Sequence, residues 1–466
     1  MLASSSVKGQ QQKVTAVLEI VMGDNLSSHA VAGFQTHFNS GLICRYCSID
    51  YSTFRDTLEI SKFRLRTHKV YEHQIKNIDE DPADAAIYGI KHKCVFSSLS
   101  YFRVSDAFPP DLMHDCLEGV IPVTMYHVLK TLHDLKLITI IDINSSLSEV
   151  RIPSSDKPNF FPDNFFNGKK IVGTATQKLE LFFILPQLVN INHVSDTAAW
   201  DVYLTLRACM DYILSPVIEK EWLPHIAGLI QDYIHKFKEV FGGEFLIPKH
   251  HYMMHIPLMM EKFGPLRNIW CMNYEAKHQY FKKLIVNTRN FINVTHTLAE
   301  RHQMRLAHAL ASTKFFSKGS EPHSAIKEIK FDKLPQTLKL TIQEKIGKAI
   351  KGDTVISTTR SLLSDGLLYT LHSSTCYILD IIHDRPFFAQ IKYMTMIEGK
   401  WYLCLKGFAP IEFIDNIHAY EVECYPSWFA VLPQELADTH KHRIYRRNSK
   451  TYAYTVFSVT EHNKDL

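Results

Sequence analysis

Residues 109 to 120 place four reactive side chains among apolar neighbours, in the order Pro-Pro-Asp-Leu-Met-His-Asp-Cys-Leu-Glu-Gly-Val. After the Pro-Pro pair, Asp111 can cap a helix, and His114 then lies on the same helical face. Asp115 and Glu118 add two further carboxylates, and such groups are costly to bury unless they are paired or bind a metal ion. The segment therefore indicates either a polar or metal-binding cluster or an N-capped surface helix.

A second group of candidate ligands begins with Cys44-Arg-Tyr-Cys47, and His68 and His73 follow in the same polar region. Two thiolates separated by two residues can chelate zinc from one turn, and two imidazoles can complete a tetrahedral site. We therefore predict a zinc site formed by Cys44, Cys47, His68 and His73. The alternative is that the pairing is incidental in a chain with 25 histidines.

Two more features lie further along the chain. Glu275 comes early in a segment that is rich in aromatic residues, with His278 three positions later on the same helical face. Upstream, His251 and His255 are four residues apart, a spacing that lets two imidazoles bind one ion from a helix. Taken alone, a core helix with one salt-bridged glutamate explains this region equally well.

The composition is that of an ordinary globular protein. The chain has 466 residues, of which 46% are hydrophobic and 21% charged, so it can form several domains with cores. It shows no secretory signal at its N-terminus and no apolar run long enough to span a bilayer. Its nine cysteines are scattered, which does not indicate a disulfide framework. We expect an intracellular protein that is neither secreted nor bound to a membrane. The net charge of +4 permits nucleic-acid binding without requiring it.

The apolar pattern predicts the elements that must position these residues. An apolar run over 15–22 predicts a strand that ends beside Asp24, followed by a helix over about 27–38. Later segments have helical periodicity, most clearly 221–240, where apolar residues recur at a period of 3.6. The other predicted helices are 127–137, 177–189, 196–214 and about 274–312.

The C-terminal part changes to strands. Segments 375–382, 387–397 and 400–407 are apolar and aromatic, and Glu398-Gly399 predicts a tight hairpin turn. We therefore expect a small β-barrel or sandwich. Its last segment, 441–450, interleaves basic and aromatic residues, which is typical of nucleic-acid contacts and also of an edge strand protected by charges.

The order of the motifs resembles that of cut-and-paste transposases of the CACTA (EnSpm) type. The resemblance covers roughly residues 15 to 310. It is specific because separate motifs occur in the family's order. These are Gly23-Asp24-Asn25 with Val31-Ala-Gly-Phe34, Cys44-Arg-Tyr-Cys47, Pro-Pro-Asp-Leu-Met-His with Leu-Glu-Gly-Val, Phe-Gly-Pro-Leu at 263–266, and Tyr-Glu-Ala-Lys-His at 274–278.

The resemblance implies an RNase H-like core in which a DDE triad binds two Mg²⁺ or Mn²⁺ ions for phosphodiester transfer. Asp24 resembles the second Asp of that triad and Glu275 its final Glu. Asp111 and His114 resemble the family's D-x-x-H signature. In the related V(D)J recombinase catalytic subunit, the counterpart of this signature helps to hold a zinc ion with histidines just before the catalytic Glu. This suggests a second zinc site formed by Asp111, His114, His251 and His255, and the alternative is a hydrogen-bonded polar cluster.

The expected fold is therefore α+β (α/β): an incomplete RNase H-like core interrupted by a large all-helical insertion, with a small C-terminal β-barrel or sandwich domain. The predicted regions are 1–43 (second half of the core sheet), 44–100 (zinc-binding loops), 101–245 (helical insertion), 246–315 (return to the core with Glu275), 316–350 (linker) and 351–466 (β domain).

One departure from the family limits the expected activity. Only 23 residues precede Asp24, and Glu19 is the one acidic residue among them, so we expect the first catalytic Asp to be missing. We therefore expect an N-terminally truncated, transposase-derived nuclear protein that binds DNA with weak sequence specificity, or binds protein, and carries out no autonomous strand transfer. A second copy of the chain, in a homo-oligomer, is a further candidate partner. The two alternatives are an active Mg²⁺-dependent transposase or nuclease completed by a missing N-terminal segment, and a structural zinc-containing interaction scaffold.

Overall fold

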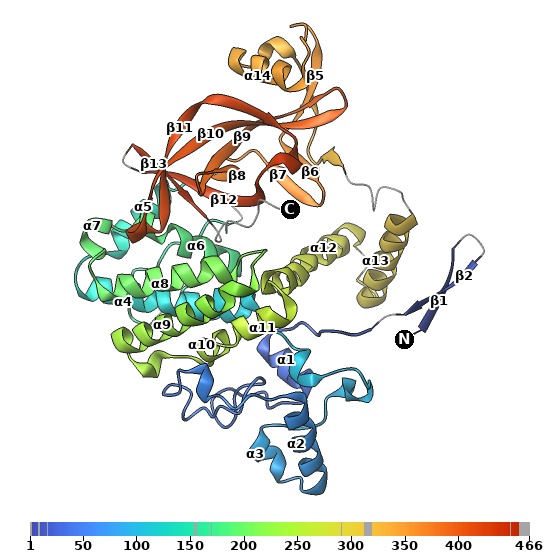
Figure 1. Cartoon of the computed structure of the whole chain (residues 1–466), viewed down its shortest axis with the longest axis vertical. Coiled ribbons are helices and arrows are strands. Elements are labelled where there is room, and N and C mark those ends of the chain that lie inside the picture. The colour runs from blue at the N-terminus through green and yellow to red at the C-terminus, as the bar shows by residue number, and fades with distance from the viewer. Residues whose placement is uncertain are drawn as a thin grey trace. The chain divides into compact units, whose positions relative to one another are not determined.

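The computed structural model describes residues 2–7, 10–15, 17–152, 156–168, 170–289, 291–311, 319–447 and 449–455 (Figure 1). The chain is of the α+β class and divides into two compact units. The first unit comprises Met1–Lys136, Asn164–Phe182 and Asp196–Glu275, and the second comprises Leu137–Asp163, Phe183–Ser195 and Ala276–Leu466.

Helices form the centre of the first unit. The longest, α9, buries its apolar residues at the predicted helical period, including Ile226, Ile230 and Phe237. It packs on α8, which packs on α4, and Figure 1 shows these three helices side by side. The helices of this unit are α1 (Asn25–Ala32), α2 (His68–Glu80), α3 (Asp84–Tyr88), α4 (Ile121–Asp134), α8 (Ala198–Ile213), α9 (Leu223–Phe241), α10 (Pro248–Met253) and α11 (Ile256–Phe263).

Polar contacts inside this bundle join helices that are distant in sequence. The Tyr233 hydroxyl on α9 lies 2.7 Å from the Thr124 hydroxyl on α4 and 3.1 Å from Nε2 of His250 on α10. All three side chains are buried, so the contacts satisfy groups that would otherwise be costly to bury. The bundle thus fixes the start of α10, which carries His251.

The second unit contains a closed antiparallel barrel. Its strands pair in the cycle β8-β9-β10-β11-β13-β12 and back to β8, and β5 and β4 extend the sheet from β9. This confirms the expected small β domain. The strands are β8 (Thr375–Ile382), β9 (Arg385–Ile397), β10 (Lys400–Ile414), β11 (Ala419–Val431), β12 (Asp438–Arg447), β13 (Lys450–Tyr454), β5 (Val355–Thr359) and β4 (Lys327–Lys330).

The predicted hairpin turn is present between β9 and β10. Ile397 pairs with Lys400, and the two residues between them, Glu398 and Gly399, have φ values of 50° and 77°. Positive φ at both positions is typical of a type I′ turn, which matches the twist of antiparallel strands. A three-stranded sheet of β3 (Ser320–Pro322), β6 (Ser361–Ser364) and β7 (Leu367–Thr370) accompanies the barrel.

The remaining elements are strands β1 and β2 at the start of the chain, two helices that cross from one unit to the other, and the helices of the second unit. Helix α6 begins in the first unit and ends in the second, and α12 continues from Glu275 into the second unit. They are β1 (Leu2–Val7), β2 (Gln10–Thr15), α5 (Ile140–Glu149), α6 (Ala175–Leu188), α7 (Ile191–Val194), α12 (Met272–Thr288), α13 (Val294–Ala311) and α14 (Gln336–Ile346).

Several sequence predictions need correction. The strand predicted over 15–22 is not formed over 17–22: residues 17–24 have no regular structure, and the Val21 amide donates a backbone bond to the Ala107 oxygen. Thr15 ends β2, and residue 16 lies outside the described residues. In the described part of the first unit, only β1 and β2 form a ladder, so an apolar run beside Asp24 has no strand to pair with. The RNase H-like core therefore stays a prediction. The helix predicted over 27–38 ends at Ala32.

Two further segments also differ from expectation. The predicted linker 316–350 contains α14, whose Leu338 and Ile342 pack in a core with Phe331 and Tyr402. The basic and aromatic segment 441–450 belongs to β12 and β13, and its Tyr445 is buried. The aromatic residue in this segment therefore packs within the barrel domain, and nucleic-acid binding by the exposed basic residues of the segment stays a prediction.

Gly33 offers a test of the close packing at the end of α1. Its φ is 87°, and a Cβ atom added there would lie 1.9 Å from the backbone oxygen of His92. Gly33→Ala should therefore lower the free energy of unfolding by more than about 2 kcal/mol, since a left-handed conformation alone costs about 1–2 kcal/mol. Gly228→Ala, in α9 with open space around it, should instead stabilise the protein by about 1 kcal/mol. Urea unfolding measures both, and equal effects would contradict the packing argument.

Candidate metal centre and acidic cluster

The Cys44–Cys47 turn is held by backbone contacts that aim both thiols inward. The Tyr46 amide donates a hydrogen bond to Cys44 Sγ at 3.3 Å, and the backbone of Cys47 forms an isolated antiparallel β-bridge with Leu65. The buried Arg66 side chain donates from Nε to the backbone oxygens of Cys44 and Cys47, each at 3.3 Å. Contacts within the protein therefore fix the turn without a bound ligand.

The two histidines reach this turn from the other end of the helical bundle. His251 lies in α10 and His255 is the residue before α11, and their Nε2 atoms are 3.2 Å apart. Cys47 Sγ is 3.3 Å from His251 Nε2, and Cys44 Sγ is 3.6 Å from His255 Nε2. All four side chains are buried, and their ligand atoms lie within 4.8 Å of one another. This cluster can hold a metal ion.

Aromatic rings close the site from water. The Phe63 ring lies 4.8 Å from the His251 ring and 5.6 Å from the His255 ring, and Tyr46 lies 5.1 Å from His255. Within the described structure, the Nδ1 atoms of both histidines are buried without a hydrogen-bond partner. Each imidazole therefore uses only Nε2 for a polar contact, and that atom points at the thiols.

The electrostatics of the site favour a thiolate. Burial opposes ionisation of the Cys44 thiol, but a hydrogen bond from Cys47 and the nearby imidazoles of His255 and His251 offset it, so that the pKa of Cys44 lies well below its usual value. A thiolate and neutral imidazoles are the ionisation states that bind metals. Burial and the neighbouring Cys44 raise the pKa of the Cys47 thiol, so Cys44 is the thiol of this pair that ionises first. The cluster therefore has the geometry that a metal ion needs, and metal binding would release the Cys47 proton.

The structure groups the predicted ligands differently from the sequence prediction. Cys44 and Cys47 lie with His251 and His255, and His68 and His73 are not part of the cluster. His68 is the first residue of α2 and pairs with Glu72 at 3.3 Å, and His73 is exposed on the same helix. Proximity in sequence grouped the cysteines with His68 and His73, whereas the structure groups them with His251 and His255.

Asp111 and His114 form a separate cluster, without His251 or His255. His114 Nδ1 lies 2.5 Å from Asp111 Oδ2, and the Cys271 amide donates to Asp111 Oδ1 at 2.7 Å. Asp111, His114 and Cys271 form a second group whose ligand atoms lie close enough to hold a metal ion. On its other side, His114 Nε2 is 3.6 Å from Glu275 Oε1. Spacing alone gave no signal for Cys271, whose role depends on this folding.

The helix that carries His114 has an unusual form. Residues Met113–Val120 form a π-helix, which continues into α4. A π-helix is rare, and short π segments are frequent at functional sites. Within this segment His114 is partly exposed and Asp115 is buried, as is Asp111 just before it.

A buried network joins the cysteine turn to both acidic segments. Arg45, between the two cysteines, donates to Asn25 Oδ1 at 2.7 Å, and Asn25 donates to Asp115 Oδ1 at 2.5 Å. Burial raises the pKa of Asp115 to about 6, although Arg45 opposes this shift. Asn25 follows Asp24, and Asp115 follows His114, so the network fixes the two segments relative to the turn. No spacing or motif indicated this role for Arg45 or Asn25.

Asp24 lies at the edge of the same region. Its carboxylate caps α1 by accepting a bond from the Ser27 amide at 2.7 Å. Burial acts to raise its pKa, but the bonds from Ser27 and the nearby His114 lower it overall. Asp24 also acts electrostatically on Cys271, as Glu275 does, so the charges of Asp24, Asp111 and Glu275 meet around His114 and Cys271. The structure thus brings the two predicted catalytic residues to one region of the first unit.

Comparison with known proteins gives no independent identification. No family model matches the chain, and no curated protein matches it. Among the described residues, no helix is both long and apolar enough to cross a membrane.

The metal centre predicts a specific pattern of metal content. His255→Ala removes one of the four ligands of the Cys44, Cys47, His251 and His255 centre. The metal content should therefore fall from about one ion per chain to well below one. The substitution should also lower the midpoint of thermal unfolding, since the binding free energy of a structural metal is also folding free energy. Elemental mass spectrometry and calorimetry measure the two effects. His73→Ala is the matched control, and equal metal loss in both variants would contradict this assignment.

The Asp111–His114 pair predicts a dependence of stability on pH. The hydrogen bond to Asp111 raises the pKa of His114 above its usual value, although burial opposes it. The stabilisation is therefore complete below about pH 6.5 and is lost as the pH rises through the folded-state pKa. His114→Gln should flatten the fall in unfolding free energy above about pH 6.5 relative to His73→Gln. Urea unfolding at each pH tests this, and parallel profiles for the two variants would contradict it.

Proposed function

We propose that this chain is a transposase-derived, nuclear DNA-binding protein of the CACTA type, with a zinc ion in the Cys44, Cys47, His251 and His255 centre. The observation that carries the proposal is the convergence of these four ligands from segments that the family's motif order places apart in sequence. Two thiols and two imidazole Nε2 atoms, all buried, fit the tetrahedral site that structural zinc prefers. When bound, zinc would cross-link the cysteine turn to the α10–α11 region.

The acidic residues support the same origin. His255 lies twenty residues before Glu275, the place where the resemblance expects zinc-binding histidines. Asp24 and Glu275 would be the second and third catalytic carboxylates, and carboxylates are the ligands that Mg²⁺ or Mn²⁺ requires. The protein's own groups hold these positions: Ser27 keeps Asp24 ionised, and His114 faces Glu275.

Asp111 and His114 have a different role in this proposal from the one predicted for a second zinc site. Asp111 uses both carboxylate oxygens, one for the Cys271 amide and one for His114. It therefore orients the His114 ring, whose Nε2 faces the Glu275 carboxylate. The D-x-x-H pair would position the glutamate, while zinc holds the surrounding chain.

The proposal predicts salt-dependent DNA binding without strand transfer. In fluorescence anisotropy with a 30-base-pair duplex, the full chain should bind at about 50 mM salt and lose affinity steeply towards about 200 mM, since counterion release dominates such binding. With Mg²⁺ or Mn²⁺ present, we expect no cleavage of the duplex.

The outcomes separate the three functions considered. Absence of binding at 50 mM salt would overturn the proposal and favour a structural scaffold. Metal-dependent cleavage that disappears in Glu275→Gln, but persists in the matched variant Glu328→Gln on β4, would replace the proposal with an active nuclease or transposase.

A further inference from the structure

Helices α12 and α13 form a hairpin with little buried surface. Neither helix contains a fully buried residue among those described. The chain reverses between them at Arg289 and Asn293, which have φ values of 49° and 51°. This break replaces the single helix that the sequence predicted over about 274–312. A helix pair with so little burial gains little from packing, so another role must be sought for its exposed surface.

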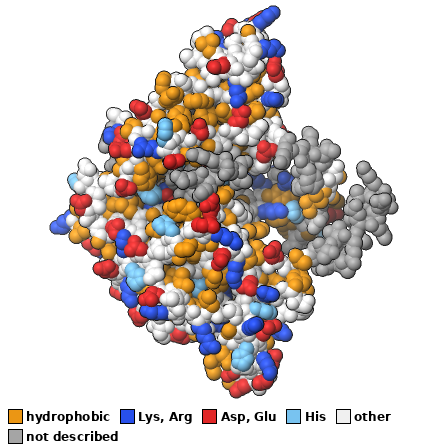
Figure 2. Space-filling view, viewed as in Figure 1, with side chains coloured by type: hydrophobic (Ala, Val, Ile, Leu, Met, Phe, Trp, Pro, Cys, Tyr) orange, Lys and Arg blue, Asp and Glu red, His pale blue; other side chains and the backbone are white. Residues whose placement is uncertain are grey.

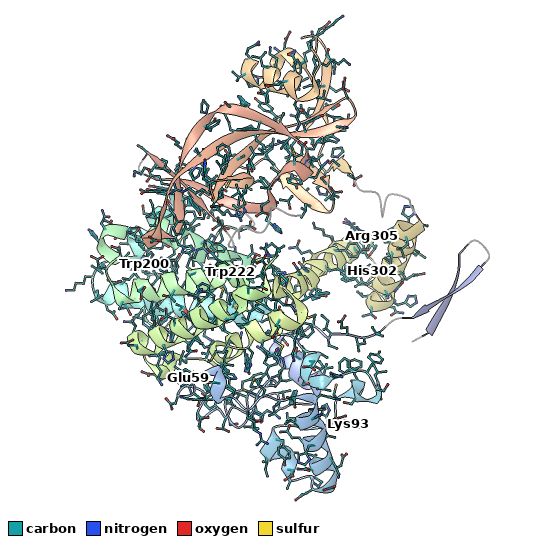
Figure 3. All side chains as sticks on the ribbon, viewed as in Figure 1. Glu59, Lys93, Trp200, Trp222, His302 and Arg305 are labelled. Carbon is teal, nitrogen blue, oxygen red and sulfur yellow. The ribbon has the colours of Figure 1, made fainter. Side chains whose placement is uncertain are left out.

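The two helices touch through aromatic and cationic groups. The His302 ring on α13 lies 6.0 Å from the Tyr280 ring and 5.7 Å from the Phe281 ring on α12. The Arg305 guanidinium lies 4.7 Å from the Tyr280 ring centre. Figure 3 shows His302 and Arg305 projecting from the same helix. These contacts fix the hairpin and leave its remaining cations directed to solvent.

The charge of this hairpin differs sharply from that of the chain. Across the whole chain 52 Lys and Arg balance 48 Asp and Glu, and Figure 2 shows the two signs interspersed over much of the visible surface. Between residues 276 and 311, Glu300 is the only carboxylate, and it lies 4.0 Å from His296. The cations in this range are all exposed, and the described structure pairs none of them with a carboxylate: Lys277, Lys282, Lys283, Arg289, Arg301 and Arg305.

We propose that the α12–α13 hairpin binds the phosphate backbone of a nucleic-acid duplex, an inference that rests on the proposed function. Exposed, unpaired cations at this density are the electrostatic requirement for such binding. Lys277, Lys283 and Arg301 are exposed and can meet phosphates, whereas Arg305 packs on Tyr280 and holds the two helices together.

Two other occupants fit less well. A second copy of the hairpin would bring its cations against each other, and like charges placed together oppose association. An anionic membrane would require apolar residues gathered on one helical face. Leu306 and Leu310 are exposed on one side of α13, but Met304 projects from another side, and the exposed Phe291 and Ile292 lie outside both helices. Among the described residues, no helical face of the hairpin therefore carries more than this pair beside its cations. The nucleic-acid backbone needs only the cations, which are present.

The test is a triple variant, Lys277→Gln, Lys283→Gln and Arg301→Gln, that spares Arg305 because it packs on Tyr280. Its matched control removes three exposed cations elsewhere in the second unit: Lys327→Gln, Lys330→Gln and Lys351→Gln. For each protein, anisotropy with the 30-base-pair duplex gives the slope of log K against log salt. Each lost phosphate contact should reduce that slope by about 0.9, so the hairpin variant should lose up to about 2.7 and the control little. Circular dichroism and metal content verify that both variants are folded.

The outcomes distinguish this inference from the proposed function. If the wild type binds the duplex and both variants keep its salt slope, the hairpin surface is overturned while DNA binding stands. If the wild type does not bind at low salt, the proposed function fails together with this surface. If the hairpin variant keeps duplex binding but loses binding to phosphatidylserine vesicles, the surface is a membrane site and this inference is overturned.

Discussion

The first unit depends on four side chains that meet from opposite ends of its sequence. Cys44 and His255 are separated by 211 residues, and Cys47 and His251 by 204, yet their ligand atoms are in contact distance. A cross-link over such a loop removes conformational entropy from the unfolded chain worth about 5 kcal/mol in a simple chain model. The chain segment between the two ligand pairs contains most of the helical bundle, so a metal ion in the centre would close this segment into a loop. Metal binding would therefore stabilise the bundle as well as the cysteine turn.

The centre also controls the polar residues beside it. Arg45 lies between the cysteines, so any constraint on the turn constrains the Arg45 guanidinium, which bonds Asn25 and two backbone oxygens of Phe108 and Pro109. Removing one partner from a buried, charged network costs about 3–5 kcal/mol. The network thus makes the arrangement of Asp24 and His114 a consequence of the same turn. Stability and the geometry of the acidic cluster cannot vary independently in this unit.

Much of the local structure could be predicted from the sequence, because it depends on nearby residues. The 3.6 period of α9 and the Glu398-Gly399 turn required no distant partner, and both predictions are confirmed. The ligand set could not be predicted in the same way. The cysteines were assigned to His68 and His73 because these are near in sequence, whereas the partners reach them only through the packing of α8, α9 and α10. The strand prediction for the apolar run was wrong over 17–22 for a related reason, since a strand needs a neighbouring strand, which periodicity does not reveal.

The hairpin shows why net charge is a poor guide to such surfaces. A chain with 52 Lys and Arg and 48 Asp and Glu has a small net charge, so its composition permitted nucleic-acid binding without indicating which surface would bind. Like charges four residues apart on a helix, as at Arg301 and Arg305, destabilise it by about 0.2–0.5 kcal/mol. Neither helix offsets this repulsion with buried apolar residues. A bound phosphate backbone would relieve the repulsion directly. The hairpin would then gain stability from the same contacts that provide its affinity, and its binding and its folding would be coupled.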